Sequence, residues 1–520
     1  MSGPTGLSGL PKAPDHVEPA PEWGRLDARM LVVRPLHEIV GFVPVLVALL
    51  VFGTGDAWRV LLSLAVIVLL VLRGLFSWLT TRYRISESQV ELHSGLLSRK
   101  RKAVPRDRIR TADLTAKFGH RLFGLSAIRI GTGQHAKGKA DGLLLDAVPV
   151  PEAERLRVVL LQRGVGHREA AVETAPAEAR STAIATLHRS WLRFAPLSLS
   201  GLLSIGAVIG VLVNAANEVD VRISRMAAVK EVVRWARESS LVLVVAVAIA
   251  VVLVLAVLGS LLKYVLQYAG YRLTRQADGT VRVTRGLLTT RSVSIEEKRL
   301  RGVQVGEPML LRAGHGAKVS AVTTGLGKEQ GGSLLLPPAP RAEAHRVVAE
   351  VLRLPEPPTS AELTRHPRRA LARRLVRAVG AAVLVEAALL LTVAAWDWPL
   401  VLPLAWLVAL PAAAWLGVDR YRRLGHALTE RYLVSRTGSL DTKTVALQRD
   451  GIIGWRIRRT WFQRRTGLMT VTATTAAGRG AYSVPDIGEA DGVALALDAV
   501  PGLLRPFAEP VSPESRPTPS

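Results

Sequence analysis

Long apolar runs alternate with polar, strand-rich segments along the chain, and the apolar runs come in pairs. A membrane-spanning helix needs about 20 mostly apolar residues. Six runs reach or approach that length: 39–53, 58–79, 194–216, 239–262, 378–396 and 398–418. The first is short and needs His37 and Thr54 to suffice. We therefore predict six membrane spans, arranged as three helical hairpins.

A polar segment follows each hairpin, and its hydrophobic pattern predicts short strands closed by one helix. In the first segment, residues 83–86, 90–93 and 128–130 alternate apolar with polar side chains, as half-buried strands do. Pro151 then opens a stretch with apolar side chains at helical spacing. Helices are expected at the matching places in the other segments, 342–352 and 487–500. A small barrel or sandwich plugged by its C-terminal helix is the natural architecture.

The three segments are copies of one module. When positions are counted from Gly95, Gly286 and Gly438, the same kinds of residue recur at fixed offsets. An arginine lies 26 positions on in each copy: Arg121, Arg312 and Arg464. A strand-forming aliphatic residue lies 33 positions on: Ile128, Val319 and Val471. Agreement at fixed offsets is the sign of an internal repeat.

These patterns predict an α+β membrane protein in which each helical hairpin precedes one module. The expected divisions are a disordered tail (1–34), hairpin 1 (35–81), module 1 (82–163), a linker (164–188), hairpin 2 (189–265), module 2 (266–354), a linker (355–372), hairpin 3 (373–419), module 3 (420–503) and a disordered tail (504–520).

Arginine placement predicts which side of the membrane the modules occupy. The turns of the first and third hairpins hold almost no basic residues, whereas arginines crowd their module-side ends, as at Arg373, Arg374 and Arg377. Basic residues stay on the cytoplasmic side. The connection 217–238 of the second hairpin is mixed in charge, and its pattern predicts an amphipathic helix on the outer surface. We expect modules and termini in the cytoplasm, and the plasma membrane as the location.

Composition narrows the function classes. The net charge of +26 raises the possibility of nucleic-acid binding, but the arginines gather beside apolar runs, where membrane topology alone places them. We therefore predict no nucleic-acid partner. The chain has no cysteine, which excludes disulfides, thiolate metal sites and cysteine nucleophiles.

Several motifs of the first module resemble a known family. A membrane hairpin is followed by Tyr-Arg-Ile-Ser at 83–86, Ser-Gly-Leu-Leu at 94–97, Val-Pro-Arg-Asp-Arg-Ile at 104–109 and Arg-Leu-Phe-Gly-Leu at 121–125. This order resembles the bacterial pleckstrin-homology domain, type 2. The whole chain is similar to the three-module membrane form of that family over roughly residues 35–500, with the second and third copies more divergent. The resemblance implies a PH-like barrel with a C-terminal helix and no known catalytic residues.

Two sets of basic residues are candidate binding sites. The run Arg99, Lys100, Arg101 and Lys102 is close enough to the membrane to hold anionic headgroups or a partner. It also fits a solvated edge strand that charge protects from aggregation. The repeated Arg121, Arg312 and Arg464 suggest either a common ligand site or structural contacts, with an acidic partner or a strand-end carbonyl.

Glu386 is a third candidate, because it lies near the middle of the fifth predicted span. An acid inside the membrane costs several kcal/mol unless it is protonated or paired, so it suggests function. The alternative is a neutral, hydrogen-bonded acid that fixes the packing of the spans.

No reaction centre is predicted. The 11 histidines are scattered without metal-ligand spacing, and no motif predicts a metal, a cofactor or a catalytic group. We therefore expect a non-enzymatic interaction platform for proteins or peptides, assisted by anionic lipids. The alternatives are a transporter with regulatory modules, or a lipid-modifying enzyme, for which a carboxylate or histidine cluster at the membrane border would be the sign. Oligomeric state is left open.

Overall fold

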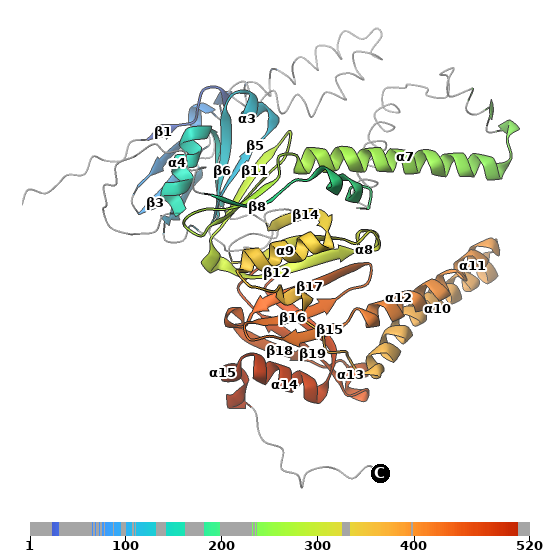
Figure 1. The fold of residues 1–520 in the computed structure, drawn as a ribbon. Helices are drawn as coiled ribbons and strands as arrows, with labels where there is room; N and C mark the ends of the chain where they lie inside the picture. Colours follow the sequence, from blue (N-terminus) through green and yellow to red (C-terminus); the bar gives the residue numbers. More distant parts are fainter. Residues whose placement is uncertain are drawn as a thin grey trace, which may run out of the picture.

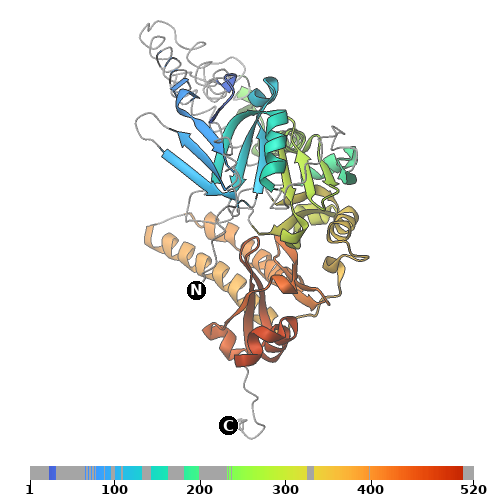
Figure 2. The ribbon, with the colours of Figure 1, turned by 90° about the vertical axis from the view of Figure 1, so that its left-hand side faces the viewer.

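The computed structural model describes residues 23–30, 78–86, 88–94, 100–106, 111–131, 142–161, 181–197, 237–324, 333–396 and 399–507, with a few single residues between them. Figures 1 and 2 show three modules stacked one on the next, with the first and third at opposite ends of the stack. The helices α7 and α10–α12 project from the stack on the same side (Figure 1).

The modules repeat one order of elements, in which three strands are followed by three more strands and a helix. Module 1 consists of β2 (Arg82–Ile85), β3 (Gln89–Ser94), β4 (Lys100–Pro105), β5 (Thr111–Ala116), α3 (Phe118–Leu122), β6 (Leu125–Gly131), β7 (Gly142–Pro149) and α4 (Val150–Leu161). Module 2 consists of β9 (Arg272–Arg275), β10 (Val281–Arg285), β11 (Thr290–Ile295), η5 (Glu297–Arg299), β12 (Leu300–Pro308), α8 (Met309–Ala313), β13 (Gly316–Thr323), β14 (Leu334–Pro340) and α9 (Arg341–Leu352). Module 3 consists of β15 (Gly425–Leu428), β16 (Tyr432–Thr437), β17 (Asp441–Gln448), η7 (Arg449–Gly451), β18 (Gly454–Arg458), α13 (Trp461–Arg465), β19 (Leu468–Thr474), β20 (Ala481–Gly488), α14 (Glu489–Ala499), α15 (Pro501–Leu504) and η8 (Arg505–Phe507).

The described residues form four sheets, all antiparallel, and two of these sheets run through a module boundary. The strand orders are β1-β2-β3-β4, β7-β6-β5-β11-β10-β9-β8, β14-β13-β12-β17-β16-β15 and β18-β19-β20. The second half of module 1 is therefore continuous with the first half of module 2, and module 2 continues into module 3 in the same way. A module is a two-layer sandwich whose sheets extend into its neighbours, not a separate closed barrel.

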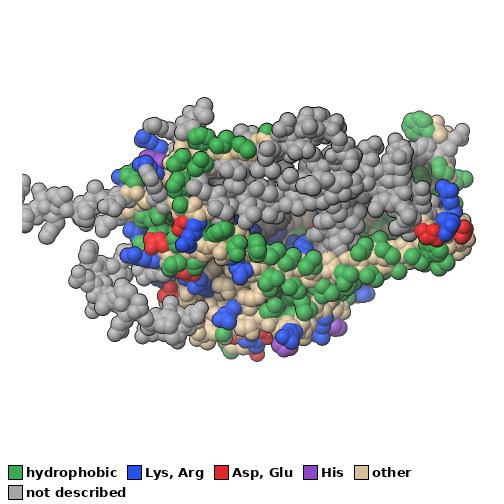
Figure 3. Space-filling view, turned by 90° about the horizontal axis from the view of Figure 1, so that it is seen from above, with side chains coloured by type: hydrophobic (Ala, Val, Ile, Leu, Met, Phe, Trp, Pro, Cys, Tyr) green, Lys and Arg blue, Asp and Glu red, His purple; other side chains and the backbone are tan. Residues whose placement is uncertain are grey.

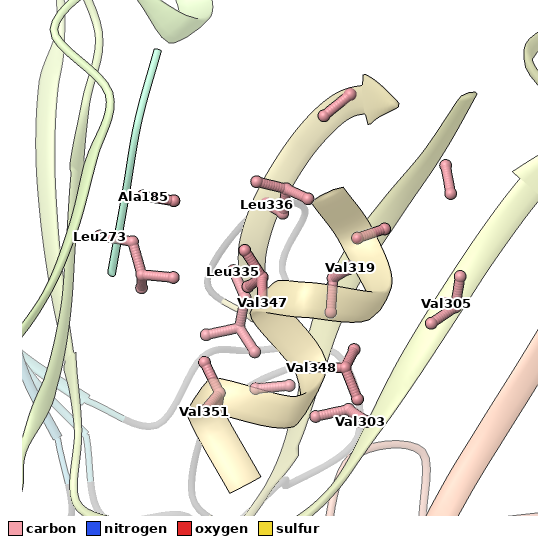
Figure 4. Packing of buried hydrophobic residues seen from close by; sticks show 14 of the residues in the cluster. Ala185, Leu273, Val303, Val305, Val319, Leu335, Leu336, Val347, Val348 and Val351 are labelled. Carbon is pink, nitrogen blue, oxygen red and sulfur yellow. The ribbon is translucent and has the colours of Figure 1, made fainter. Parts of the chain in front are cut away.

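The middle module shows how the two layers and the helix pack. Val347, Val348 and Val351 of α9 lie against the strands, and all three are at most 1% exposed (Figure 4). The same apolar cluster includes Leu273 of β9 and Val303 of β12, one from each sheet. Burial of the helix face against both layers stabilises the module, at about 25 cal/mol per Å² of apolar surface.

A short segment before each hairpin pairs with the first strand of the module after it. Strands β1 (Gly24–Arg25) and β8 (Thr182–Thr186) pair with β2 and β9, and Thr364 bridges to His426 of β15. Each predicted hairpin therefore lies, in the sequence, between two segments that pair with each other.

This arrangement differs from the expected disordered tail and linkers. Residues 23–30 hold β1 and the buried Leu26 and Met30. The expected linker 164–188 ends in β8, and 355–372 contains η6 (Pro358–Ser360) and the start of α10. Two- to five-residue strands in Pro- and Gly-rich sequence have too few positions to show a period, so composition alone indicated linkers.

Three helices among the described residues are long and apolar enough to cross a membrane: α7 (Leu241–Tyr268), α10 (Arg368–Trp396) and the interrupted α11 (Val401–Trp406) with α12 (Ala409–Arg422). Their apolar side chains are exposed, as at Val242 (80%), and Figure 3 shows a hydrophobic band running outward from the modules. Most of the other three predicted spans, most of 217–238 and the C-terminal residues from 508 lie outside the described residues.

Candidate functional site: the joints between modules and the open sheet edges

Neighbouring modules are joined by strand addition. At joint 1, β5 of module 1 pairs with β11 of module 2 over three residue pairs, from Thr290↔Ala116 to Ser292↔Leu114. At joint 2, β12 of module 2 pairs with β17 of module 3 over seven, from Gly302↔Leu447 to Pro308↔Asp441. Main-chain hydrogen bonds across such a pair supply affinity without requiring particular side chains.

Both joints have the same register. Ala116 follows Gly95 by 21 positions, and its partner Thr290 follows Gly286 by 4. Pro308 follows Gly286 by 22 positions, and its partner Asp441 follows Gly438 by 3. Each pair of offsets totals 25. The joints are therefore two instances of one interface, and the register is a property of the repeated module.

The repeated arginines are part of this interface. Arg121 on α3 donates a hydrogen bond to the carbonyl of Leu287, which directly follows the turn residue Gly286 of the next module. Arg312 on α8 donates to the carbonyl of Ser439, 3.1 Å away, which directly follows the turn residue Gly438. The arginine of one module thus binds the same carbonyl of the next module at both joints.

Arg312 makes further contacts that Arg121 does not. Its guanidinium lies 2.7 Å from Thr442 Oγ1 and 3.4 Å from the Asp419 carboxylate, at the end of α12. Joint 2 also shares its core, because Val322 of module 2 packs in the cluster of module 3. Joint 2 is therefore the stronger of the two.

Joint 1 depends instead on the helix α4. Arg157 of α4, 4% exposed, donates to Ser294 Oγ of β11 at 2.6 Å and pairs with Glu154 at 3.0 Å. Glu154 also pairs with Arg282 of β10. Desolvation lowers the pKa of the Arg157 guanidinium. These contacts hold two modules that share only a short pair of strands.

Arg464 lies at the same repeat position in module 3. It is exposed on α13, and its side chain makes no hydrogen bond or ion pair with the described part of the chain. Of the two interpretations left open by the sequence, structural contacts describe Arg121 and Arg312, whereas Arg464 has neither kind of partner here.

We expect Arg312→Ala to weaken joint 2 by about 2 kcal/mol, because Asp419 and the Ser439 carbonyl lose a charge-assisted donor in a partly buried place. Arg464→Ala is the matched control and should change the unfolding free energy by less than about 0.5 kcal/mol. Denaturant unfolding of the full chain in detergent measures both. Equal effects would contradict the assignment of Arg312 to the joint.

The basic run lies on an open edge. Strand β4 pairs with β3 on one side and with no described strand on the other, and Arg101 and Lys102 are exposed. Arg99 and the Lys100 side chain lie outside the described residues. At the opposite end of the stack, β18 is also an edge strand, with Arg456, Ile457 and Arg458 exposed. Charge on these edges protects them from unspecific pairing.

A buried polar cluster fastens hairpin 3 to module 3. The Asp486 carboxylate, 2% exposed, pairs with Arg373 and with Arg374 of α10, the latter at 2.8 Å. Gln463 Nε2 donates to the same carboxylate at 3.0 Å. Asp486 adopts a positive φ of 60°, and its carbonyl accepts from His366 Nδ1 at 3.1 Å. The carbonyls of Ala147 and Pro338, at the matching places, also accept hydrogen bonds from segments outside their own strands.

The paired histidines make this attachment sensitive to acid. Burial and the neighbouring His426 lower the pKa of His366 to about 4. His366 Nδ1 donates to Asp486, so its Nε2 accepts from His426 Nδ1 at 3.2 Å. Both rings are therefore neutral at pH 7.

We expect module 3 to lose stability as the pH falls from about 6.5 towards 4. The unfolded chain binds a proton at His366 from about pH 6.5, whereas the folded chain resists it, so acid favours unfolding by up to roughly 3 kcal/mol. Thermal unfolding at several pH values measures the loss. His366→Asn keeps a donor for the Asp486 carbonyl and should flatten the profile; an unchanged profile would assign the loss to other groups.

Glu386 lies in α10 and is half-buried. Its Oε2 atom is shielded from solvent and has no hydrogen-bond partner among the described residues. The same residues contain no group of three or more His, Asp or Glu that could hold a metal ion. Glu386 is therefore an isolated acid of the hairpin.

The sequence did not predict the importance of Gly302, Asp419, Asp486 or His366. Gly302 carried one signal, because Gly454 lies at the same offset from its turn glycine, but Thr111 breaks the pattern in module 1. Asp486 and His366 have no counterpart in the other copies at their positions, Ala147 and Pro338 taking the place of Asp486. Only their packing reveals them.

The repeated sandwich, its joints and its apolar helices define a class of membrane protein with modules in series. The bacterial PH domain family matches residues 39–164, 208–355 and 375–499, so the chain belongs to that family. It is similar to the UPF0699 transmembrane protein YdbT of Bacillus subtilis (strain 168), with 23% identity over 440 residues that cover 81% of this chain and 85% of the relative. No solved structure matches the chain.

Proposed function

We propose that this is a multi-pass protein of the bacterial cell membrane whose three modules lie in the cytoplasm as a non-enzymatic platform for protein partners. The observation that supports it is the repeated joint. The modules already bind one another by strand addition in one register, and strand edges of the same kind remain open on β4 and β18. Strand addition to a sheet edge is a general mode of peptide recognition.

Anionic lipids of the inner leaflet would assist by holding the modules near the membrane. Exposed arginines surround the module-side ends of α10 and α12: Arg368, Arg369, Arg377, Arg420 and Arg422. Each such cation near an anionic surface contributes about 1 kcal/mol. Arg373 and Arg374 are excluded from this role, because they are bound to Asp486.

Single-cysteine labelling tests the orientation directly, because the chain has no native cysteine. We expect Asp397→Cys, which falls between the two predicted spans of hairpin 3, to react with a membrane-impermeant maleimide on intact cells. Lys298→Cys, exposed in module 2, should react only after permeabilisation. The reverse pattern would place the modules outside and contradict the proposal.

Photo-crosslinking in living cells tests the platform. A photoreactive residue at Ile457, exposed on the β18 edge, should give a discrete protein adduct that Arg464→Ala removes. The same group at Lys298 is the control and should give none. Absence of any protein adduct at Ile457 would contradict the platform.

Transport is the second candidate, and Glu386 is the observation in its favour. An unpartnered carboxylate inside a spanning hairpin is a place where an ion can bind. The break between α11 and α12 lies in the same hairpin, whereas α7 of hairpin 2 is continuous. Ion flux into vesicles that depends on Glu386 would favour transport, and a platform shows no such flux.

A further inference from the structure

The third module carries a copy of the interface that joins the modules, and no described residue occupies it. Strand β18 corresponds to β5 and β12, and Arg464 corresponds to Arg121 and Arg312. At the two internal joints these elements bind the turn and third strand of the next module. At β18 and Arg464 nothing in the described residues takes that place.

A glycine in β18 supports the same conclusion. Gly302 and Gly454 both lie 16 positions after their turn glycines. A Cβ at Gly302 would lie 2.1 Å from the carbonyl oxygen of Ala446, in the strand of the next module. A Cβ at Gly454 would meet only the Thr474 hydroxyl of its own sheet, at 3.1 Å. Module 3 thus keeps a glycine where a partner strand would approach closely, although no described strand lies there.

The shared register states which residues a bound strand would oppose. Residues 454–458 of β18 lie 16 to 20 positions after Gly438. At both joints the offsets of two paired residues from their turn glycines total 25. Residues 454–458 would therefore face positions 9 to 5 after the turn glycine of a partner. In a second copy of this chain those positions are Val104, Ala103, Lys102, Arg101 and Lys100.

A second copy therefore sets like charges against each other. Arg456 would face Lys102, and Arg458 would face Lys100. Like charges directly opposite in an antiparallel pair are destabilising. At the internal joints the cation at position 5, Arg291 or Lys443, faces an uncharged residue, Thr115 or Gly306. Self-association through this edge is disfavoured, and the charge points to a different partner.

We propose that β18 and Arg464 bind the turn and third strand of a PH-like module in another protein, with acidic residues 5 and 7 positions after its turn glycine. Arg464 donates to the carbonyl that follows that glycine, and the two acids face Arg458 and Arg456. The proposal rests on the platform function and names the fold and charge of one partner of that platform.

A charge-changed copy of the chain serves as the probe. Lys100→Glu with Lys102→Glu supplies the two acids on β4, so this chain is called the donor. The chain that binds it through β18 and Arg464 is called the acceptor. Arg464→Ala in the donor prevents the donor from acting as an acceptor as well. We expect this donor to form a 1:1 complex with the native chain in detergent, at least tenfold tighter than the native chain binds itself. Arg464→Ala in the acceptor should weaken the complex at least tenfold. Sedimentation of labelled protein measures both.

A matched donor carries Arg155→Glu and Lys298→Glu, two exposed cations outside both edges, with the same Arg464→Ala. It should not bind. If thermal unfolding shows that the first donor does not fold, the charges are reversed in the acceptor instead. The acceptor then carries Arg456→Glu and Arg458→Glu, and the donor keeps its native Lys100 and Lys102.

Two results would overturn the proposal. Failure of both charge exchanges to produce a complex would mean that β18 is not a docking edge. If the native chain binds itself as tightly as the charge-exchanged pair does, charge does not select the partner. The β18 edge would then bind a second copy of this chain. The crosslinking experiment in cells is independent of these, since it can fail for the platform while the purified edges still bind.

Discussion

Gly302→Val should separate the second module from the third. The valine Cβ would start 2.1 Å from the carbonyl oxygen of Ala446, which is a backbone atom of the partner strand and has no rotamer to change. The strands must move apart, and the seven paired residues of joint 2 lose their register. We expect a loss of at least about 3 kcal/mol, at the upper end for overpacked sites.

The measurement is denaturant unfolding of the full chain. Limited proteolysis, with cleavage sites mapped to the paired strands β12 and β17, is the local readout. Gly454→Val is the matched control, because Gly454 lies at the same repeat position and pairs with β19 of its own module, while no described strand lies on the other side of β18. Valine suits a strand better than glycine does, so this control should stay within about 1 kcal/mol of the native chain. Equal losses for both variants would show that the glycine serves its own module and not the joint.

Asp486→Asn should detach hairpin 3 from module 3. The change keeps the shape and tolerates the positive φ at this residue, but it removes the charge that neutralises Arg373 and Arg374. Both guanidinium groups are nearly buried, with side chains 12% and 11% exposed. Removing one partner of a buried ion pair costs roughly 3–5 kcal/mol, because the remaining charge stays out of water.

Thermal unfolding of module 3 and protease sensitivity at the base of α10 report the detachment. Glu489→Gln is the control, since its ion pair with Arg459 is between half-exposed side chains and contributes at most about 1 kcal/mol. A loss for Asp486→Asn no larger than that of this control would mean that the arginines find water or other partners, and the cluster would not be a fastening point.

Several features of the fold follow from the residues along the chain. The triplication is visible because the module length and the offsets of Arg121, Arg312 and Arg464 are conserved between copies. The α9 helix, predicted at 342–352, is observed at Arg341–Leu352, because its apolar positions recur with helical period. Membrane helices are predictable from length and composition, since a long uncharged apolar run has few stable environments other than a membrane.

Other features did not follow. The segments around β1, β8 and Thr364 have the composition of linkers, yet they pair with strands that lie beyond a whole membrane hairpin. Their partners are distant in sequence, and a strand of two to five residues has no detectable period of its own. The role of the repeated arginines was likewise open, because one sequence does not show which carbonyl a side chain reaches.

The chain by itself determined that there are three copies of one strand-rich module, that long apolar helices accompany them, and where the arginines recur. These are local properties: the period of apolar side chains, the length of apolar runs and the spacing between repeated residues. Only the tertiary structure decided that the modules share sheets in one register, that Arg121 and Arg312 bind the next module while Arg464 does not, and that Asp486 neutralises α10. Those facts depend on pairing between distant backbone segments, which is set by the complementarity of exposed edges after each module has folded.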